Sequence, residues 1–203
     1  MSETVNVTRT TIDFLRHGEV AGGPCLRGVT DDPLTEKGWQ QMHSQCAGGQ
    51  WSRCISSPLR RCAEFAAALS QERHFELELD PNWREISFGD WDGLPASQID
   101  PKALERYYAN PDAYTPPNAE AYAAFADRIG VAWERLLRHH AGQSLLVITH
   151  AGVIRHLFAH LLAISVPRSL HIEVPHACLT RFSCFDDAAG RFVQLNYHRP
   201  LGF

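Results

Sequence analysis

The sequence lacks the features that mark membrane, exported and nucleic-acid-binding proteins. No apolar run approaches the roughly 20 residues that a membrane-spanning helix needs. The first residues, Met1 to Asn6, do not show the basic and then apolar pattern of a secretory signal. The formal net charge is -4, so no global positive field draws the chain to nucleic acid or to an acidic membrane. These absences favour a cytoplasmic protein without a nucleic-acid or membrane partner.

The cysteines also lack the spacing of a metal or redox motif. Cysteines stand at positions 25, 46, 54, 62, 178 and 184, and none forms a Cys-x-x-Cys pair. We therefore expect reduced thiols. The sequence has no internal repeat and no low-complexity segment. With 203 residues, of which 44% are hydrophobic and 21% charged, the chain is predicted to form a single domain over residues 1–203.

Segments with the pattern of strands alternate with segments that have the pattern of helices. Strands are predicted at 10–15, 51–55, 75–79, 144–149, 177–185 and 191–196, and helices at 35–45, 58–69, 97–109, 119–140 and 153–163. The run at 144–149 is continuously apolar, which is typical of a central parallel strand. The first strand is also mostly apolar, with the exception of Asp13. The alternation predicts an α/β fold, a three-layer αβα sandwich whose central sheet is mostly parallel with an antiparallel edge.

Two of the predicted strands end in a histidine that precedes a turn with glycine. Arg16-His17-Gly18 follows the first strand, and His150-Ala151-Gly152 follows the apolar run. In an open α/β sheet, ligands bind at the carboxyl ends of the strands. If the two strands are neighbours, both imidazoles lie at the same edge of the sheet. Gly18 would then let the backbone approach a bound group closely.

A third segment is expected to add positive charge to this edge. Ser57 is predicted to cap the next helix, with Pro58 at its first position. Arg60 and Arg61 follow, and consecutive helical residues point about 100° apart, so only one of them can face the site. A helix N-terminus, a guanidinium group and two imidazoles together predict a compact cationic pocket for a phosphate group.

Five ordered motifs make the sequence resemble the histidine phosphatase superfamily, also called phosphoglycerate mutase-like. They are Leu15–Glu19, Thr30–Gly38, Ser56–Cys62, Glu85–Gly93 and Thr149–Arg155, and they extend over nearly the whole chain. Carried over by position, the resemblance implies that His17 is the nucleophile that becomes phosphorylated. It implies that Glu85 is the proton donor to the leaving oxygen. It also implies that Arg16, Arg61 and His150 hold the phosphoryl oxygens. Of the two consecutive arginines, Arg61 and not Arg60 is then the one that faces the site.

Further expectations follow from this resemblance. Arg27 and Gly28 lie near the family's substrate-contacting block and are candidates for substrate binding. A cationic surround should keep His17 unprotonated, so that a nitrogen lone pair is free to attack. Protein cations would neutralise the phosphoryl charge, so no metal and no cofactor is implied. The aromatic residues Trp83, Phe88 and Trp91 are predicted to anchor the loop that carries Glu85.

The resemblance leaves the substrate and the reaction type open. The short length and the motifs at 56–62 and 88–93 look most like those of the α-ribazole phosphatases. That implies a small phosphorylated metabolite as partner, with α-ribazole 5′-phosphate of cobalamin biosynthesis as the candidate. The alternatives are mutase-type phosphoryl transfer and a broad-specificity sugar or nucleotide phosphatase. More remote are a metal-dependent hydrolase that uses His156 and His160, spaced i,i+4, and a non-catalytic module that binds phospho-ligands.

Overall fold

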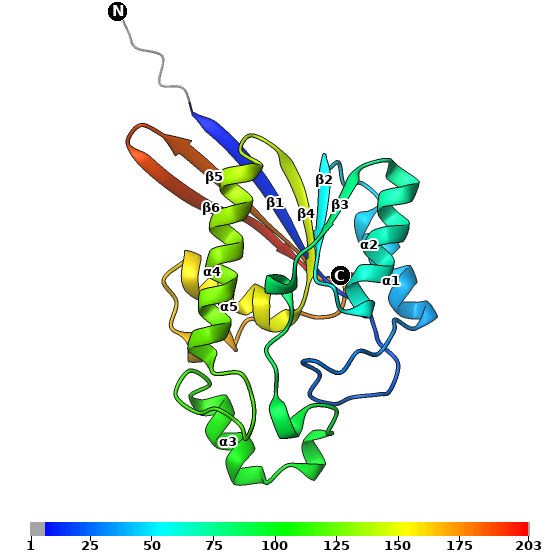
Figure 1. The fold of residues 1–203 in the computed structure, drawn as a ribbon, viewed down its shortest axis with the longest axis vertical. Helices are drawn as coiled ribbons and strands as arrows, with labels where there is room; N and C mark the ends of the chain where they lie inside the picture. The colour runs from blue at the N-terminus through cyan, green and yellow to red at the C-terminus, as the bar shows by residue number, and fades with distance from the viewer. Residues whose placement is uncertain (1–6, 203) are drawn as a thin grey trace, which may run out of the picture.

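The computed structural model describes residues 7–202, and within them six strands form one sheet (Figure 1). The strands are β1 Thr8–Arg16, β2 Arg53–Ser56, β3 Glu76–Leu79, β4 Ser144–Thr149, β5 Leu179–Asp187 and β6 Gly190–Arg199. Their order in the sheet is β3-β2-β4-β1-β5-β6. The first four are parallel, whereas β5 pairs antiparallel with β1, and β6 antiparallel with β5. The predicted mostly parallel sheet with an antiparallel edge is confirmed.

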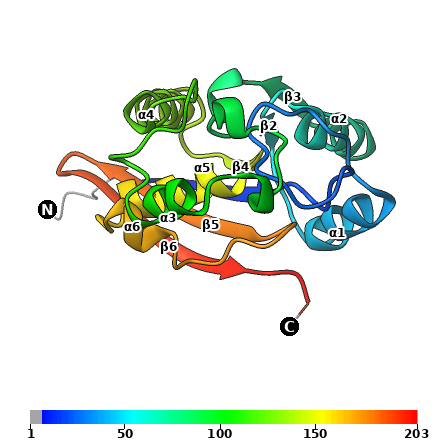
Figure 2. The same cartoon turned by 90° about the horizontal axis from the view of Figure 1, so that it is seen from below.

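Helices cover both faces of this sheet, which makes three layers as predicted. On one face lie α1 (Glu36–Cys46) and α2 (Arg60–Arg73), and on the other α4 (Tyr122–His139) and α5 (Ala151–Leu161), as Figure 2 shows from below. The alternation of side chains along β1 explains the division. Ile12 and Phe14 pack with α4 and α5, whereas Leu15 packs with α1 and α2.

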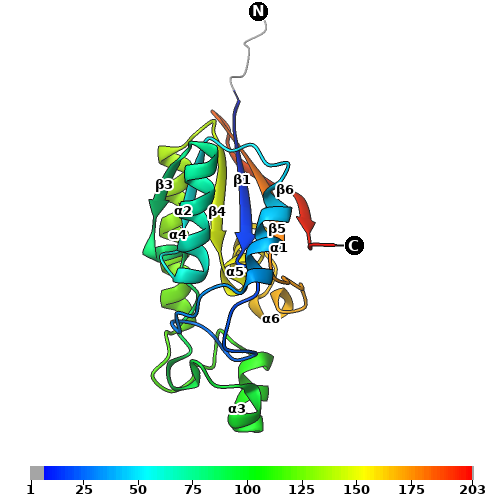
Figure 3. The same ribbon diagram turned by 90° about the vertical axis from the view of Figure 1, so that its right-hand side faces the viewer.

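A smaller helical part lies beyond the carboxyl ends of the parallel strands (Figures 1 and 3). It contains two short 3₁₀ turns, η2 (Gly89–Trp91) and η3 (Ala96–Gln98), followed by α3 (Pro101–Ala109). A separate cluster of Trp91, Ile99 and Tyr107 forms its core. A further 3₁₀ turn, η1 (Pro81–Trp83), instead places Trp83 in the core beneath α4. Trp83 and Trp91 are buried and anchor the loop that carries Glu85, as predicted. Phe88 is only partly buried and packs against two of the core clusters.

The charged residue in the first strand, Asp13, is buried and forms an ion pair with the partly exposed Arg181. Its carboxylate accepts two hydrogen bonds from Arg181, at 2.8 and 2.7 Å. It also accepts one from the indole N–H of Trp51 at 2.7 Å and one from the hydroxyl of Tyr197 at 3.1 Å. A buried carboxylate with all its lone pairs engaged is tolerated in a core. Asp13 therefore ties the antiparallel edge to β1.

Two local expectations differ from the structure. Helix α2 begins at Arg60 with Leu59 as N-cap, so Ser57 is not its capping residue. A short helix, α6 (Val166–Ser169), occurs where none was predicted. Its length of four residues leaves no periodicity to detect.

All six cysteines are free thiols. No helix among residues 7–202 is long and apolar enough to cross a membrane.

Candidate active site

The two strand-end histidines lie side by side. Strands β1 and β4 pair in register, with Arg16 opposite Thr149, so the next residue of each strand is a histidine. The His17 N–H donates to the Thr149 carbonyl at 3.0 Å, and the ring centroids of His17 and His150 are 5.3 Å apart. Both side chains are buried at this edge of the sheet.

The hydrogen bonds of His17 define which of its nitrogens can react. Its Nδ1 lies 2.9 Å from the Gly18 carbonyl oxygen. Because a carbonyl only accepts, Nδ1 carries the proton, and Nε2 of the neutral ring keeps its lone pair. Burial, together with the positive charges of Arg16 and Arg61, holds the pKa of His17 well below its usual 6.5. The imidazole is therefore neutral at pH 7, as expected for a nucleophile in a cationic pocket.

Gly18 has a structural role that differs from the expected one. A Cβ at this position would lie 2.2 Å from the carbonyl oxygen of Gly38 in α1. The glycine therefore allows close contact between the first loop and α1, and this contact explains its identity without a bound group.

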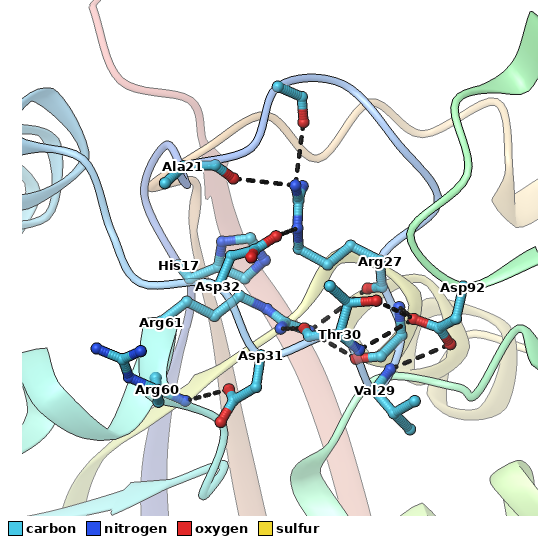
Figure 4. A network of polar contacts seen from close by, with 12 residues as sticks. His17, Ala21, Arg27, Val29, Thr30, Asp31, Asp32, Arg60, Arg61 and Asp92 are labelled. Atoms are coloured by element: carbon cyan, nitrogen blue, oxygen red, sulfur yellow. Dashed lines mark hydrogen bonds and ion pairs between the residues drawn. The ribbon is translucent and has the colours of Figure 1, made fainter.

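Arg61, and not Arg60, faces the site (Figure 4). The Arg61 side chain is fully buried, and its Nε donates to Nδ1 of His150 at 3.3 Å. Its Nη1 donates to the Thr30 carbonyl at 2.7 Å and its Nη2 to the Gly28 carbonyl at 2.9 Å. Arg60 is instead exposed and pairs with Glu64 at 2.7 Å. The structure thus places Arg61, the arginine selected from the family motif, beside His150, and its contact with a phosphoryl group stays a prediction.

His150 is held through both of its ring nitrogens. Because Nδ1 accepts from Arg61, the proton resides on Nε2, which donates to the Ser57 hydroxyl at 2.9 Å. Burial and the Arg61 charge keep the pKa of His150 well below 6.5. Ser57, which the sequence suggested as a helix cap, is thus a component of the site. Its hydroxyl retains its own hydrogen for a further acceptor.

Arg16 offers a donor beside His17 that the protein leaves unused. Its Nη1 donates to the Val174 carbonyl at 2.7 Å. Its Nε is buried and has no hydrogen-bond partner among the described residues. Burial lowers the pKa of Arg16 to about 10, so the guanidinium stays charged at pH 7. A buried cationic N–H without a partner is costly, and an anion that binds there would relieve this cost.

Glu85 lies at the N-terminus of α5, next to His150. One carboxylate oxygen accepts from the Gly152 N–H at 2.9 Å and the other from the Ile86 N–H at 3.1 Å. The loop before it is held by Arg128 of α4, which donates to the carbonyls of Asn82, Arg84 and Glu85 at 2.7 to 3.0 Å. Sequence reasoning missed Arg128, because nothing in a helix pattern marks a side chain that binds a distant loop.

Of the two candidates for substrate binding, Arg27 is largely engaged within its own loop. It donates to Asp32 at 2.8 Å and to the carbonyls of Ala21 and Gly23 at 3.0 Å (Figure 4). Three of its five N–H groups are thus used, which leaves those on Nη1. Arg27 lines the same cavity as Arg16. The predicted contact of Arg27 with substrate stays a prediction.

Gly28, the second candidate, is required by contact between two loops. A Cβ at this position would meet the Ile86 carbonyl at 2.2 Å. Its N–H donates to Asp92 at 2.9 Å, and the same carboxylate accepts from the N–H groups of Thr30 and Phe88. Burial opposes ionisation of Asp92, but these hydrogen bonds prevail and lower its pKa. Asp92 therefore holds the loop whose carbonyls hold Arg61.

Two cavities open at this end of the sheet. The first lies beside Arg16 and is lined by Glu19, residues 20–25, Arg27, Thr35 and His176. The second lies beside Glu85 and is lined mainly by aromatic and apolar side chains, with Arg155 at its edge. Its lining includes Leu26, Phe88, Tyr107, Tyr108, Tyr122, Phe125, Ala151 and Leu170. Glu85 lines the second cavity together with Ala151 and Gly152 of α5.

The histidine pair on α5 is engaged with other side chains. Nδ1 of His156 lies 2.9 Å from the Tyr122 hydroxyl, and its ring stacks on His160 with centroids 5.8 Å apart. Among residues 7–202, no group of three or more histidine, cysteine, aspartate or glutamate side chains is placed to hold a metal ion.

Comparison with known proteins identifies the family. The family model described as the histidine phosphatase superfamily (branch 1) matches residues 12–198. The chain belongs to this superfamily. It is a phosphoric monoester hydrolase, as the sequence predicted.

Individual relatives give more detail. An adenosylcobalamin/alpha-ribazole phosphatase of Salmonella typhimurium is 30% identical over 175 residues, which cover 81% of this chain and 86% of the relative. A solved mycobacterial glucosyl-3-phosphoglycerate phosphatase is 25% identical with a TM-score of 0.81, covering 94% of this chain and 98% of that one. A putative alpha-ribazole-5′-P phosphatase of Escherichia coli K-12 shares the fold, with a TM-score of 0.76 at 24% identity, covering 96% and 98% of the two chains.

Proposed function

We propose that the protein hydrolyses small phosphate monoesters through a phosphohistidine at His17. The observation that carries this proposal is the hydrogen bond from Nδ1 of His17 to the Gly18 carbonyl. It leaves a lone pair on Nε2 of a neutral, buried imidazole beside two guanidinium groups.

The first step transfers the phosphoryl group to the protein. Nε2 of His17 attacks phosphorus, the P–O bond to the leaving alcohol breaks, and protonated Glu85 gives its proton to that oxygen. Arg16, Arg61 and His150 surround the phosphoryl oxygens, and positioning with charge neutralisation is what phosphoryl transfer chiefly requires. General acid catalysis by Glu85 would contribute about 10²- to 10⁴-fold.

The second step returns the enzyme to its starting state. Water attacks the phosphohistidine, and the Glu85 carboxylate takes a proton from the water. The N–P bond breaks, inorganic phosphate leaves, and His17 regains its lone pair. Apart from the attacking water, the protein's own residues supply every catalytic group in this scheme.

We infer that the substrate is a small phosphorylated metabolite, with α-ribazole 5′-phosphate of cobalamin biosynthesis as the candidate. Two observations support it. Relatives of this chain include adenosylcobalamin/alpha-ribazole phosphatases, and the cavity beside Glu85 has aromatic walls that suit a flat ring. A cytoplasmic location fits the six free thiols.

The test is a release assay for inorganic phosphate on the wild type, His17→Ala and the control Arg60→Ala. The substrates include α-ribazole 5′-phosphate, sugar phosphates, nucleoside monophosphates and 3-phosphoglycerate. We expect His17→Ala to lose turnover while folded and the control to retain it, with and without EDTA. Substantial turnover by His17→Ala would reject the phosphohistidine. Conversion of 3-phosphoglycerate to 2-phosphoglycerate without phosphate release would identify a mutase. Loss of activity in EDTA that zinc restores would identify a metallohydrolase.

A further inference from the structure

A third histidine stands next to the nucleophile, outside the five motifs. The ring centroid of His176 lies 5.8 Å from that of His17. Its half-buried side chain lines the same cavity as Arg16. Among residues 7–202, no hydrogen bond within the protein involves a ring nitrogen of His176, whereas both ring nitrogens of His150 are bonded.

The backbone around His176 is fastened to the end of β1 on both sides. Val174 accepts a hydrogen bond from Arg16 Nη1 at 2.7 Å, and Cys178 accepts one from the Arg16 N–H at 3.0 Å. Between them, the Ala177 N–H donates to the His17 carbonyl at 3.1 Å. The position of His176 relative to His17 is therefore fixed by three hydrogen bonds.

Ala177 adopts a left-handed conformation to make this turn, with φ of 55°. This region is unfavourable for a residue with a Cβ, and such strain persists only where the surroundings enforce it. The strained turn directs the chain so that residue 176 borders the cavity, whereas Ala177 and Cys178 are buried beneath it.

The charges around His176 favour a neutral donor. Arg16, Arg27 and Lys37 act on it as cations, and Glu19 is the nearby anion. Burial and the Arg16 charge lower the pKa of His176 to about 4, so the ring is uncharged at pH 7. A neutral imidazole supplies one N–H to an anion without further repulsion among the cations.

We propose that His176 is a binding residue for the phosphoryl group, and that it donates an N–H to a non-bridging oxygen of the phosphate held beside Arg16 and His17. This inference rests on the proposed function, because it concerns the same site. It adds to the site a residue from the segment before β5, which contributes no other group to the phosphoryl pocket.

The test measures the dissociation constants of inorganic phosphate and orthovanadate for wild type, His176→Ala, His176→Asn and His176→Gln by calorimetry. The amide of Asn reaches the place of Nδ1 and that of Gln the place of Nε2. We expect His176→Ala to bind both anions about 10- to 100-fold more weakly, the range for a lost hydrogen bond to a charged group. One of the two amide variants should recover most of the affinity. His171→Ala, an exposed histidine on the preceding segment, is the control.

The outcomes separate this inference from the proposed function. Wild-type affinity in His176→Ala, or equal weakening in all three variants, would overturn the role as donor, even if the enzyme hydrolyses esters through His17. Phosphate binding that depends on His176 in a protein without phosphatase activity would support the inference and reject the proposed function. Failure of the wild type to bind either anion would overturn both.

Steady-state kinetics provide the second readout for the same variants. A donor to the phosphoryl group should change both KM and kcat for a phosphate monoester, and the amide variant that restores anion binding should restore both constants. A residue that only packs against His17 would instead respond to the size of the side chain. Equal kinetics for the Asn, Gln and Ala variants would therefore overturn the proposal.

Discussion

The carboxylate of Glu85 accepts a hydrogen bond from the N–H of Gly152 at 2.9 Å, and this contact joins the acid loop to the first turn of α5. His150 is the residue immediately before this helix. The N-terminus of α5 thus holds both His150 and Glu85 in place. The N–H groups of the first turn of a helix have no acceptor within the helix, and the Glu85 carboxylate accepts from one of them.

Gly152 can be replaced to move Glu85 selectively. In Gly152→Ala, the new Cβ would lie 2.1 Å from a carboxylate oxygen of Glu85, which is the far end of a flexible side chain. The carboxylate should therefore swing away while the helix remains, since alanine is the better helix former. We expect kcat to fall about 100-fold, the lower end of general acid catalysis. Phosphate release and thermal unfolding measure the two effects.

Gly130→Ala is the matched control, because a Cβ there meets no heavy atom within 4 Å. It should leave kcat unchanged and slightly raise the unfolding temperature. Equal activity of Gly152→Ala and wild type would contradict the proposed role of Glu85.

Asp92 is expected to support catalysis without touching the substrate. In Asp92→Asn, one oxygen becomes an amide that faces backbone N–H groups, so some donors among Gly28, Thr30 and Phe88 lose their acceptor. We predict a loss of about 1 to 3 kcal/mol in the free energy of unfolding, because partly buried donors lose their acceptor. Activity should fall as well, because the Gly28 and Thr30 carbonyls hold Arg61. Urea unfolding and kcat check this, with Asp90→Asn as the exposed comparison. A variant as stable as the wild type would disprove the network.

The His17 imidazole should resist protonation. Its pKa is held well below 6.5, so the ring stays neutral as the pH falls from 7 to 6, and Nε2 keeps its lone pair. Titration of the imidazole ¹⁵N resonances, assigned with His17→Gln, measures this directly. The acid limb of kcat/KM should accordingly show no midpoint near 6.5 that arises from His17. A His17 midpoint at or above 6.5 would contradict the electrostatic description of the site.

His156 should make the fold less stable in acid. Burial and the nearby His160 lower the pKa of His156 to about 4, below the unfolded value of 6.5. The unfolded chain therefore takes up the proton first, and stability present above pH 6.5 is lost as the pH falls toward 4. Between pH 7 and 5, this group should remove about 2 kcal/mol from the free energy of unfolding.

Urea unfolding at the two pH values tests this for wild type, His156→Gln and the exposed control His171→Gln. The drop in stability should be smaller by about that amount in His156→Gln alone. An identical drop in all three proteins would show that His156 does not contribute.

The strands and the paired histidines were predictable because both depend on local pattern. The apolar run at 144–149 requires burial on both faces, and a histidine after each of two such strands requires only that the strands be neighbours. The prediction that Ser57 caps α2 was wrong because the partner of Ser57 is not local. The Ser57-Pro58 pair has the local chemistry of a helix start, but the Ser57 hydroxyl binds His150, which is distant in the chain. A hydrogen bond to a residue so far along the chain cannot be predicted from the neighbouring residues.

The amino-acid order alone therefore suffices to predict the sheet and the family, because periodicity and short motifs are properties of neighbouring residues. The tertiary structure decides which groups support them. Asp92, Arg128 and His176 acquire their roles only when loops far apart in sequence meet, since a hydrogen bond depends on distance in space and direction. The same holds for Asp13. Its charge is unexpected in a mostly apolar strand, but in the folded protein it forms an ion pair with Arg181.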